Sequence, residues 1–494
     1  MIVAPSGCEV LQCLVGLRKK PSPTELPLGF TIDPEPIEET LTSWGGTPLL
    51  LQAFRSLGLP RSVGQHVHIK QRDRGYDEAS MVESFVVLHA LGGDCLDDFA
   101  RLREEAGLRQ MLGHELPSPE AARNFLYQFH DPQLIEEAQQ SLLAGQVAYI
   151  PDENAALQGL GRVNDDLLRE MGRRGTPQTI ATVDQDSTII ESHKKEARMS
   201  YEGSRGYQPM LAVWAETELV LADEFRDGNV PALQSPLAVA QAAFQALPET
   251  VEEYYYRGDS ACHEHELIDW LRDEQRVIGP RQKKIGFAIS ARMSPALGVA
   301  VKALPESAWQ KWRSSKKEEA EERAWAEVPF VPGEHSEKKD QQPLRYVALR
   351  IRSRQGELFA DGSAVKHFAV LTNLWDREGQ RLLEWHREKA GTIEAIHHVL
   401  KNELGAGVLP CGRFGANAAW LRLAVLTHNV LTGLKRLALP PELLSARPKR
   451  LRFLIFHTAG RLVEHARQMV LRVATTVERL RMWLKALRDL PLPA

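Results

Sequence analysis

A change of pattern near residue 178 constrains the fold more than any other feature of this sequence. From about Ile37 to Leu168, apolar residues recur three and four positions apart between Gly and Pro breaks, which is the spacing of amphipathic helices. The next run, TIATVDQDSTII, is rich in β-branched residues and lacks helical spacing, so it predicts a strand. MLAVWAE and LVLADEF predict two more strands, LAVAQAAFQALP a helix and EEYYYRGDS a fourth strand. This order predicts an α/β core that opens with an antiparallel meander.

A stretch from about Gly279 to Phe368 interrupts this core with further strand-like pieces, LRYVALRIRSR and AVKHFAVLTNL. Beyond it, TIEAIHHVLKNEL and GANAAWLRLAVLTHNVLTGLKRL have helical spacing, and the segment from Gly460 predicts one long, basic, amphipathic helix. The predicted division is an N-terminal helical region, the first part of the core, a β-rich insertion, the second part of the core and a basic C-terminal helical region, at 1–175, 176–278, 279–370, 371–435 and 436–494. The short N-terminal helices fit a helix-turn-helix-like DNA-binding module, and they fit a plain helical bundle equally well.

Composition narrows the class of protein. A length of 494 residues is a prior for about three structural units, and 43% apolar with 26% charged residues is typical of globular proteins. No run reaches the roughly 18 uncharged apolar residues that predict a membrane span, and the N-terminus lacks the pattern of a signal peptide. We therefore expect a cytoplasmic protein with no membrane partner. The five cysteines are scattered without a CxxC pair, which favours reduced thiols over a disulfide framework or a zinc finger.

Basic charge is concentrated at one end of the chain. The net charge is −4, but from Lys435 onward 13 Lys and Arg residues face only 4 Asp and Glu. Such a cluster predicts contact with DNA phosphates, and the Leu, Val and Met residues between the charges fit a dimer interface equally well. The basic residues concerned are Arg447, Lys449, Arg450, Arg452, Arg461, Arg467, Arg472, Arg479, Arg481 and Lys485.

Three acidic residues are the candidates for chemistry. Asp186 lies within the first predicted strand, with Asp184 on the same face two residues earlier. Asp259 ends the tyrosine-rich strand, and Glu394 lies on a predicted helix with Lys401 seven residues later. Each one alone is most simply a turn former or a solvated charge. Together they can converge at one edge of a sheet.

Converging carboxylates need a counter-charge. Three of them would repel one another unless cations lay between them. Hard oxygen ligands suit Mg²⁺ or Mn²⁺. Two such ions, about 3.5–4 Å apart, stabilise the attacking and the leaving oxygen of an in-line phosphoryl displacement. The combination therefore predicts a two-metal phosphoryl-transfer site.

These motifs resemble the DDE transposases of bacterial insertion sequences, in the branch whose RNase H-like core is split by a β-rich insertion. The matching segments run from about Glu39 to Lys435: VDQDST, RGYQP with a later GN, YYYRGDS, and TIEAIHHVLKNELG followed by FGANAAWLRLAVLTHNVL. The order and spacing are more specific than any one motif, with 73 residues from Asp186 to Asp259 and 135 from Asp259 to Glu394.

The resemblance implies catalytic, metal-binding roles for Asp186, Asp259 and Glu394, with Asp184 as the alternative first acid. In the family, the glutamate often has Tyr seven residues before it, Arg four before it and Lys seven after it. Here Lys401 is present, but Arg387 and Ala390 occupy the earlier positions. The expected contacts to DNA phosphates are therefore Lys401, with Arg387 or Lys389 as substitutes for the missing Arg.

The resemblance further implies cleavage of transposon ends and their transfer to target DNA by an enzyme that acts as a homodimer on DNA. The alternatives are a metal-dependent nuclease that cuts without joining, a catalytically decayed DNA-binding protein, and a metal-free hydrolase with a carboxylate pair. Two minor hypotheses concern base stacking by Trp309 or Trp312 and a zinc site. The candidate zinc ligands, which are more simply ordinary histidines, are His263, His265, His397 and His398.

Overall fold

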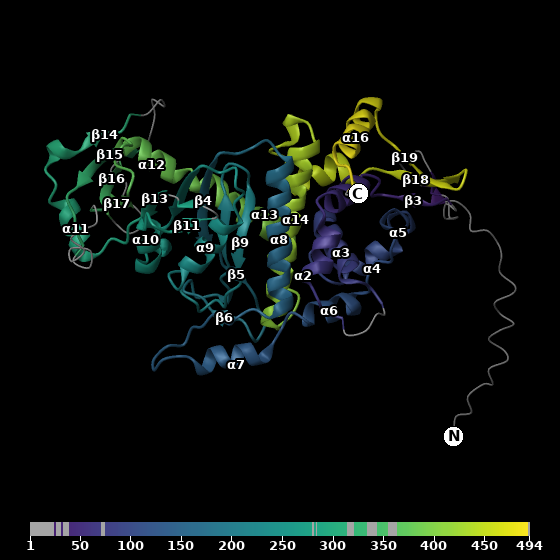
Figure 1. Ribbon diagram of the computed structural model, residues 1–494, viewed down its shortest axis with the longest axis horizontal. Helices are drawn as coiled ribbons and strands as arrows, with labels where there is room; N and C mark the ends of the chain where they lie inside the picture. The colour runs from purple at the N-terminus through teal and green to yellow at the C-terminus, as the bar shows by residue number, and fades with distance from the viewer. Residues whose placement is uncertain are drawn as a thin grey trace, which may run out of the picture.

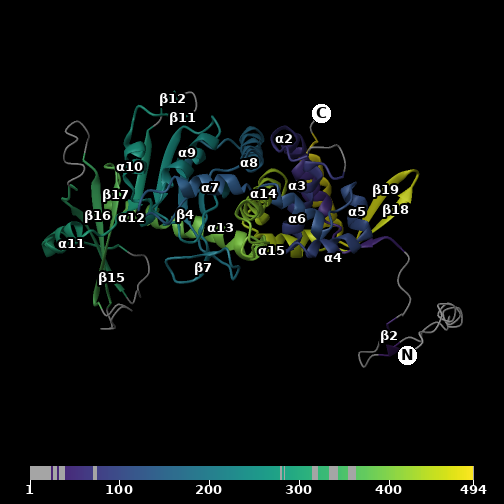
Figure 2. The ribbon, with the colours of Figure 1, turned by 90° about the horizontal axis from the view of Figure 1, so that it is seen from below.

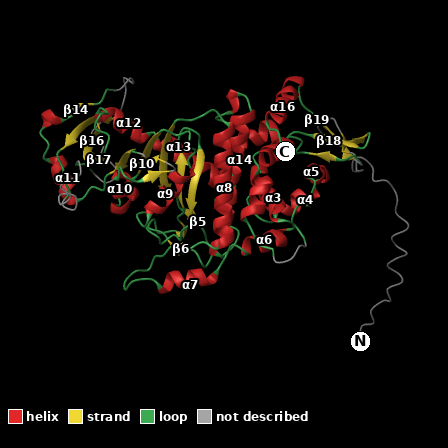
Figure 3. Cartoon of the chain, in the orientation of Figure 1, coloured by secondary structure: helices red, strands yellow, loops and turns green. Residues whose placement is uncertain are grey.

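The computed structural model describes residues 24–25, 31–32, 39–70, 75–278, 281–282, 284–313, 321–332, 343–353 and 363–492. Three parts lie side by side along the long axis of the molecule (Figure 1). A strand-rich part forms one end, a mixed sheet the centre, and a helical part the other end, as the colours of Figure 3 show.

The central sheet contains the strands that the sequence predicts. Strands β4 (Ile180–Ser187), β8 (Met210–Trp214) and β9 (Leu219–Glu224) pair antiparallel. Strands β10 (Glu253–Gly258) and β13 (Ile285–Ser290) then add in parallel, giving the order β9-β8-β4-β10-β13. This confirms the α/β class and the mixed sheet expected of an RNase H-like core.

Helices cover both faces of this sheet. Helices α9 (Pro236–Ala246) and α10 (His265–Arg272) lie on one side and α13 (Lys389–Glu403) on the other (Figure 2). Because α13 packs against β4 and β8, the residues on its inner face lie over the strand that carries Asp186. The helix expected around Glu394 is therefore present and is positioned above the core.

The insertion strands extend the same sheet. Strand β17 (Val365–Thr372) pairs antiparallel with β13, and β16 (Arg345–Ser353), β15 (Glu321–Val328) and β14 (Gln310–Lys311) follow outward. Strand β13 lies within the range expected for the insertion, but its partner on the other side is β10 of the core. Helices α11 (Pro295–Lys302) and α12 (Gly379–Arg387) flank these strands.

Helix α14 (Phe414–Ala438) joins the sheet to the helical part. It is buried on nearly all sides, because β9 packs on one side and α1, α3, α6 and α8 pack on the others. The N-terminal helices around it are α1 (Thr47–Ser56), α2 (Leu59–His66), α3 (Glu78–Leu91), α4 (Asp98–Glu104), α5 (Ala106–Leu112), α6 (Pro119–Tyr127), α7 (Pro132–Gln140) and α8 (Ala155–Arg174). Smaller elements are β5 (Ile190–Glu191), β6 (Arg198–Met199), β7 (Arg205–Tyr207) and α15 (Pro448–Leu451).

The prediction of one long helix from Gly460 is wrong. This segment forms a hairpin of β18 (Gly460–His465) and β19 (Gln468–Val473), and only then helix α16 (Val477–Asp489). Ala466 and Arg467 adopt positive φ angles of 51° and 63° at the turn, which a helix does not allow. Strand β18 also pairs with β3 (Leu41–Thr42), so the two ends of the described chain share one small sheet.

Candidate active site

Strand register brings Asp186 and Asp259 together. Gly258, the last residue of β10, pairs with Gln185 of the parallel strand β4, so the residues that follow each of them lie next to one another. Burial raises the pKa of Asp259, and the neighbouring Asp186 carboxylate raises it further. Two acids that lie far apart in the sequence therefore meet at one edge of the sheet, as expected.

Lys389 supplies a positive charge to this pair. It lies at the start of α13, is only 7% exposed, and its Nζ is 2.8 Å from Oδ2 of Asp186. Both carboxylates act against burial to raise the pKa of Lys389, so it is protonated at neutral pH. Lys389 is one of the two predicted substitutes for the missing phosphate-binding Arg, whereas its partner in this structure is the carboxylate of Asp186.

Backbone donors orient the Asp259 side chain. Asp259 precedes the short 3₁₀ turn Ser260–Cys262, and its Oδ1 accepts a hydrogen bond from the Ala261 N–H at 2.9 Å. The Cys262 side chain is buried beside it, and burial together with the Asp259 charge raises the pKa of this thiol to about 12. The thiol is therefore neutral and is not a nucleophile at neutral pH.

Asp184 is fully occupied by other contacts. Its two oxygens accept from Nε and Nη2 of Arg257 at 2.6 and 2.9 Å, and Thr392 of α13 also donates to it. Arg257 additionally donates to the backbone oxygen of Trp385 at 2.6 Å and contacts Glu388 at 3.2 Å. This buried network connects β4, β10 and the junction of α12 and α13, and it leaves no free oxygen pair on Asp184.

Glu394 is not gathered with the two aspartates. It lies on an exposed position of α13, and within the described ranges it forms no hydrogen bond or ion pair. Among the described residues, the only group of three or more His, Cys, Asp or Glu side chains whose ligand atoms all lie within 4.8 Å of one another is Asp94, Cys95 and Asp98. Asp98 there accepts backbone hydrogen bonds from the other two residues, which is a local helix-start turn.

The predicted DNA contacts lie near the acids. Lys401 donates to two neutral oxygens, Oγ1 of Thr188 at 2.9 Å and the backbone oxygen of Ile189 at 3.3 Å. Burial lowers its pKa. Arg387 is exposed at the end of α12. Lys401 is thus positioned just beyond the end of β4.

Two further residues lie within electrostatic range of the pair: Tyr201, which no sequence motif marked, and His397, which was considered only as a zinc ligand. Tyr201, in the turn between β6 and β7, is 76% exposed. Burial and the neighbouring Glu202 raise its pKa, and the charges of Asp259 and Asp186 raise it further. The turn therefore lies at the mouth of the site. His397 is buried on α13, where burial lowers its pKa to about 4, so it is neutral.

The minor hypotheses find no support in the side-chain contacts. The guanidinium of Arg350 covers the Trp309 ring at 4.4 Å, and Trp312 packs against a hydrophobic cluster of the insertion. The four histidines weighed as zinc ligands do not form a metal-binding group in the part of the chain that the structure describes. Ordinary packing accounts for the two tryptophans.

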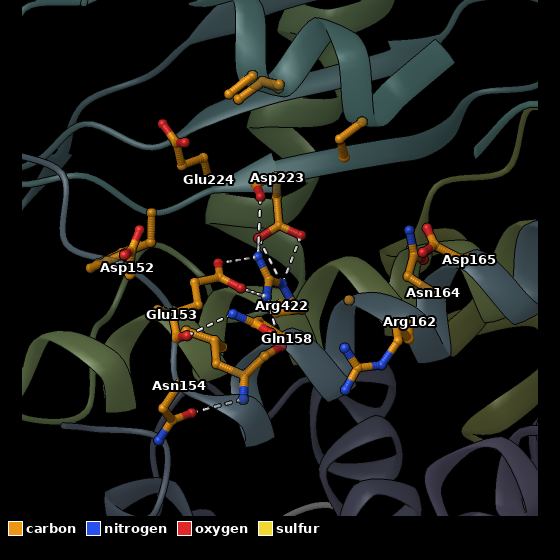
Figure 4. A pocket seen from close by; sticks show the side chains of 18 of the residues that line it. Asp152, Glu153, Asn154, Gln158, Arg162, Asn164, Asp165, Asp223, Glu224 and Arg422 are labelled. Carbon is orange, nitrogen blue, oxygen red and sulfur yellow. Dashed lines mark hydrogen bonds and ion pairs between the residues drawn. The ribbon is translucent and has the colours of Figure 1, made fainter. Parts of the chain in front are cut away.

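A separate cavity of about 840 Å³ lies between α8, α9, β9 and α14 (Figure 4). Charged side chains line it: the buried Arg422 of α14 binds Glu153 at 2.7 Å and Asp223 of β9 at 3.0 Å. None of the residues predicted for catalysis or DNA contact lines this cavity. Arg422 thereby connects α14 to the sheet and to the segment before α8.

The donor set of the carboxylate pair fits a divalent cation. Asp186 and Asp259 present hard oxygen atoms at the edge of a sheet, and their mutual repulsion is only partly offset by Lys389. A divalent cation between them would complete the neutralisation. The residues are thus of the kind that hold Mg²⁺ or Mn²⁺.

Residues 38–492 match the family described as transposase DDE domain group 1. The chain belongs to this family of transposases. The predicted family, the transposition function and the enzyme class are therefore confirmed. The family acts on DNA and generally uses divalent metal ions. As a member of the family, this transposase acts on DNA and uses a divalent metal ion.

Other comparisons add little detail. No curated protein matches the transposase. A cryo-EM structure of a piggyBac transposase synaptic complex with hairpin DNA is similar over 78% of this chain and 74% of that chain, with 11% identity and a TM-score of 0.42. None of the described helices is both long and apolar enough to cross a membrane.

Proposed function

We propose that this transposase cuts transposon ends and joins them to target DNA at the Asp186–Asp259 pair, with two Mg²⁺ or Mn²⁺ ions as cofactors. Glu394 is the proposed third acid; it lies apart from the pair on the exposed side of α13 and would have to approach it as the ions bind. The observation that carries the proposal is the register of β4 and β10, by which two carboxylates lie side by side with Lys389 as a counter-charge.

The residues divide the work as follows. Bound divalent ions supply electrostatic stabilisation of the attacking and leaving oxygens of the phosphodiester. Asp186 and Asp259 would bind these ions at the edge of the sheet, and the Ala261 N–H keeps the Asp259 carboxylate oriented. No covalent intermediate with the protein is needed, and the neutral Cys262 thiol does not provide one.

Asp186, and not Asp184, is the proposed first acid. The two side chains lie on the same face of β4, but Asp184 has both oxygens bound by Arg257 and is fully buried. Asp186 is half-buried and has one cationic partner. A ligand for an exchangeable cation must be reachable, which favours Asp186.

Lys401 is the proposed phosphate contact. Arg387, which is exposed at the end of α12, is the second proposed contact. Replacement of Lys401 by Ala should lower DNA affinity about tenfold and reduce the slope of log affinity against log salt by about one, because one phosphate contact is lost. Fluorescence anisotropy with duplex DNA at several salt concentrations measures both. Lys401→Arg keeps the charge and should retain most of the affinity; an unchanged salt slope in Lys401→Ala would contradict the assignment.

The proposed assembly is a homodimer on DNA. Helix α16 exposes Val477, Leu480 and Leu484 on one side, while Trp483 and Ala486 are buried on the other. Arg479, Arg481 and Lys485 flank the exposed stripe. An apolar stripe with basic edges suits contact with a second copy beside DNA. In contrast, Arg452 is occupied by the backbone oxygens of Ala90 and Glu403, so it is not among the DNA contacts.

A strand-transfer assay tests the proposed function. The substrate is a labelled duplex with the inverted repeat that brackets the gene, mixed with a target plasmid and Mg²⁺ or Mn²⁺. We expect cleaved ends and joined product, both abolished by EDTA and restored by excess divalent ion. Cleavage without joining would support the nuclease alternative, and cleavage that survives EDTA would support metal-free hydrolysis. Binding without cleavage would support a decayed DNA-binding protein.

A further inference from the structure

We propose that Lys389 is a resident counter-cation of the active site, which divalent ions must displace from Asp186 and which is then available to a DNA phosphate. The inference rests on the proposed function of the Asp186–Asp259 pair. It assigns to this pair a lysine that competes with the metal, and it makes metal loading and DNA contact successive uses of one side chain.

The geometry of the ion pair carries the inference. Nζ of Lys389 lies 2.8 Å from Oδ2 of Asp186, and this carboxylate is its only hydrogen-bond partner among the described residues. Asp259 adds a second negative charge close by. The ammonium group thus lies where the negative charge of the two carboxylates is greatest, which is also where a divalent ion would bind.

The Lys389 ammonium and a divalent ion cannot both bind Oδ2 of Asp186 without a cost in electrostatic free energy. A carboxylate oxygen binds Mg²⁺ at about 2.0–2.1 Å, so an ion on Oδ2 would be in the immediate neighbourhood of an ammonium held at 2.8 Å. Like charges at such separations repel strongly in a buried site. The side chain of Lys389 therefore has to leave as the ion binds.

The neighbours of Lys389 allow this movement. Lys389 is in the first turn of α13, next to Glu388, whose side chain is 67% exposed, and Ala390, which is also exposed. A long, flexible side chain at this position reaches solvent beside the carboxylates by rotation about its own bonds. A freed ammonium there faces the side from which DNA would approach Asp186 and Asp259.

Metal affinity in the absence of DNA tests the competition directly. Mn²⁺ binding to the full chain is followed by electron paramagnetic resonance of the free ion. We expect Lys389→Met to bind Mn²⁺ about tenfold more tightly than the wild type, because the competing charge is gone. Lys401→Met removes a charge from the same helix and should stay within about twofold. Equal or weaker Mn²⁺ binding by Lys389→Met would overturn the inference.

Asp186→Asn separates this inference from the proposed function. If Asp186→Asn does not weaken Mn²⁺ binding, the carboxylate pair is not the cation site and both proposals fail. If it weakens binding while Lys389→Met brings no gain, only the role of Lys389 is wrong.

A second measurement uses the wild-type protein and so does not depend on folding of a variant. Brief acetylation with an N-hydroxysuccinimide ester, read out by mass spectrometry, reports how accessible each lysine is. Mn²⁺ should accelerate modification of Lys389 at least fivefold and leave Lys401 unchanged. An unchanged or slower reaction at Lys389 would show that the ion does not release it.

Discussion

Replacement of Asp186 or Asp259 by asparagine should lower the rate of DNA cleavage by about a thousandfold or more, because each variant removes a negative charge that holds the divalent ions. Asn at position 259 keeps an oxygen that can accept the Ala261 N–H, so the local turn is retained. The rate of end cleavage under single-turnover conditions is the measurement. Asp376→Asn, in the exposed loop before α12, is the matched control and should leave the rate unchanged.

The same Asp259→Asn variant should be no less stable than the wild type in the absence of divalent ions. Burial and Asp186 raise the pKa of Asp259 in the folded state, so its ionised form opposes folding as the pH rises through the carboxylate range. Any gain in stability should therefore be present at neutral pH and vanish below about pH 4, where the carboxyl is protonated in both states. Thermal unfolding at several pH values checks this sign. Lost activity accompanied by lost stability would instead indicate a structural role.

Replacement of Asp184 by asparagine or of Arg257 by methionine should cost about 3–5 kcal/mol of unfolding free energy, because either change leaves a buried charge without its partner. The two side chains are 0% and 2% exposed and share two hydrogen bonds. Denaturant unfolding measures the loss. Glu388, which is well exposed, cannot compensate for Asp184 at the buried Nε.

The control for the Asp184–Arg257 pair is an ion pair of similar length on the surface. Arg101 and Glu104 are 2.7 Å apart but 84% and 66% exposed, so Arg101→Met should change stability by less than about 1 kcal/mol. A small loss in Asp184→Asn, equal to that of the surface variant, would contradict the structural assignment. It would also reopen Asp184 as the first metal ligand.

Local pattern predicted the elements of the core well. Strands β4, β8, β9 and β10 and helix α9 all lie where β-branched runs or helical spacing predicted them. These segments are buried, and a buried face imposes a period on the sequence that can be read directly.

The C-terminal segment shows where local pattern fails. Leu462 and Leu471 face each other across the β18–β19 pair, yet the apolar residues of this stretch also fit a helical period. Pairing of β18 with β3, more than 400 residues earlier in the chain, stabilises the hairpin instead. Only a contact between distant segments decides between a helix and a hairpin here. The local sequence does not indicate which strands pair at their edges.

The same distinction between local pattern and tertiary contact applies to the candidate active site. Motif order and spacing, together with the resemblance to a transposase family, selected Asp186, Asp259 and Glu394 as acids and Lys401, Arg387 and Lys389 as cations, because hard oxygen ligands and phosphate-binding side chains are chemically distinct. The tertiary structure decided which of two aspartates on one strand face is free and which cation lies against it. Asp184 and Asp186 have the same chemistry and differ only in what packs over them: Arg257 and Thr392 over the first, Lys389 over the second. Partners that arrive from other strands and helices leave no trace in the local sequence.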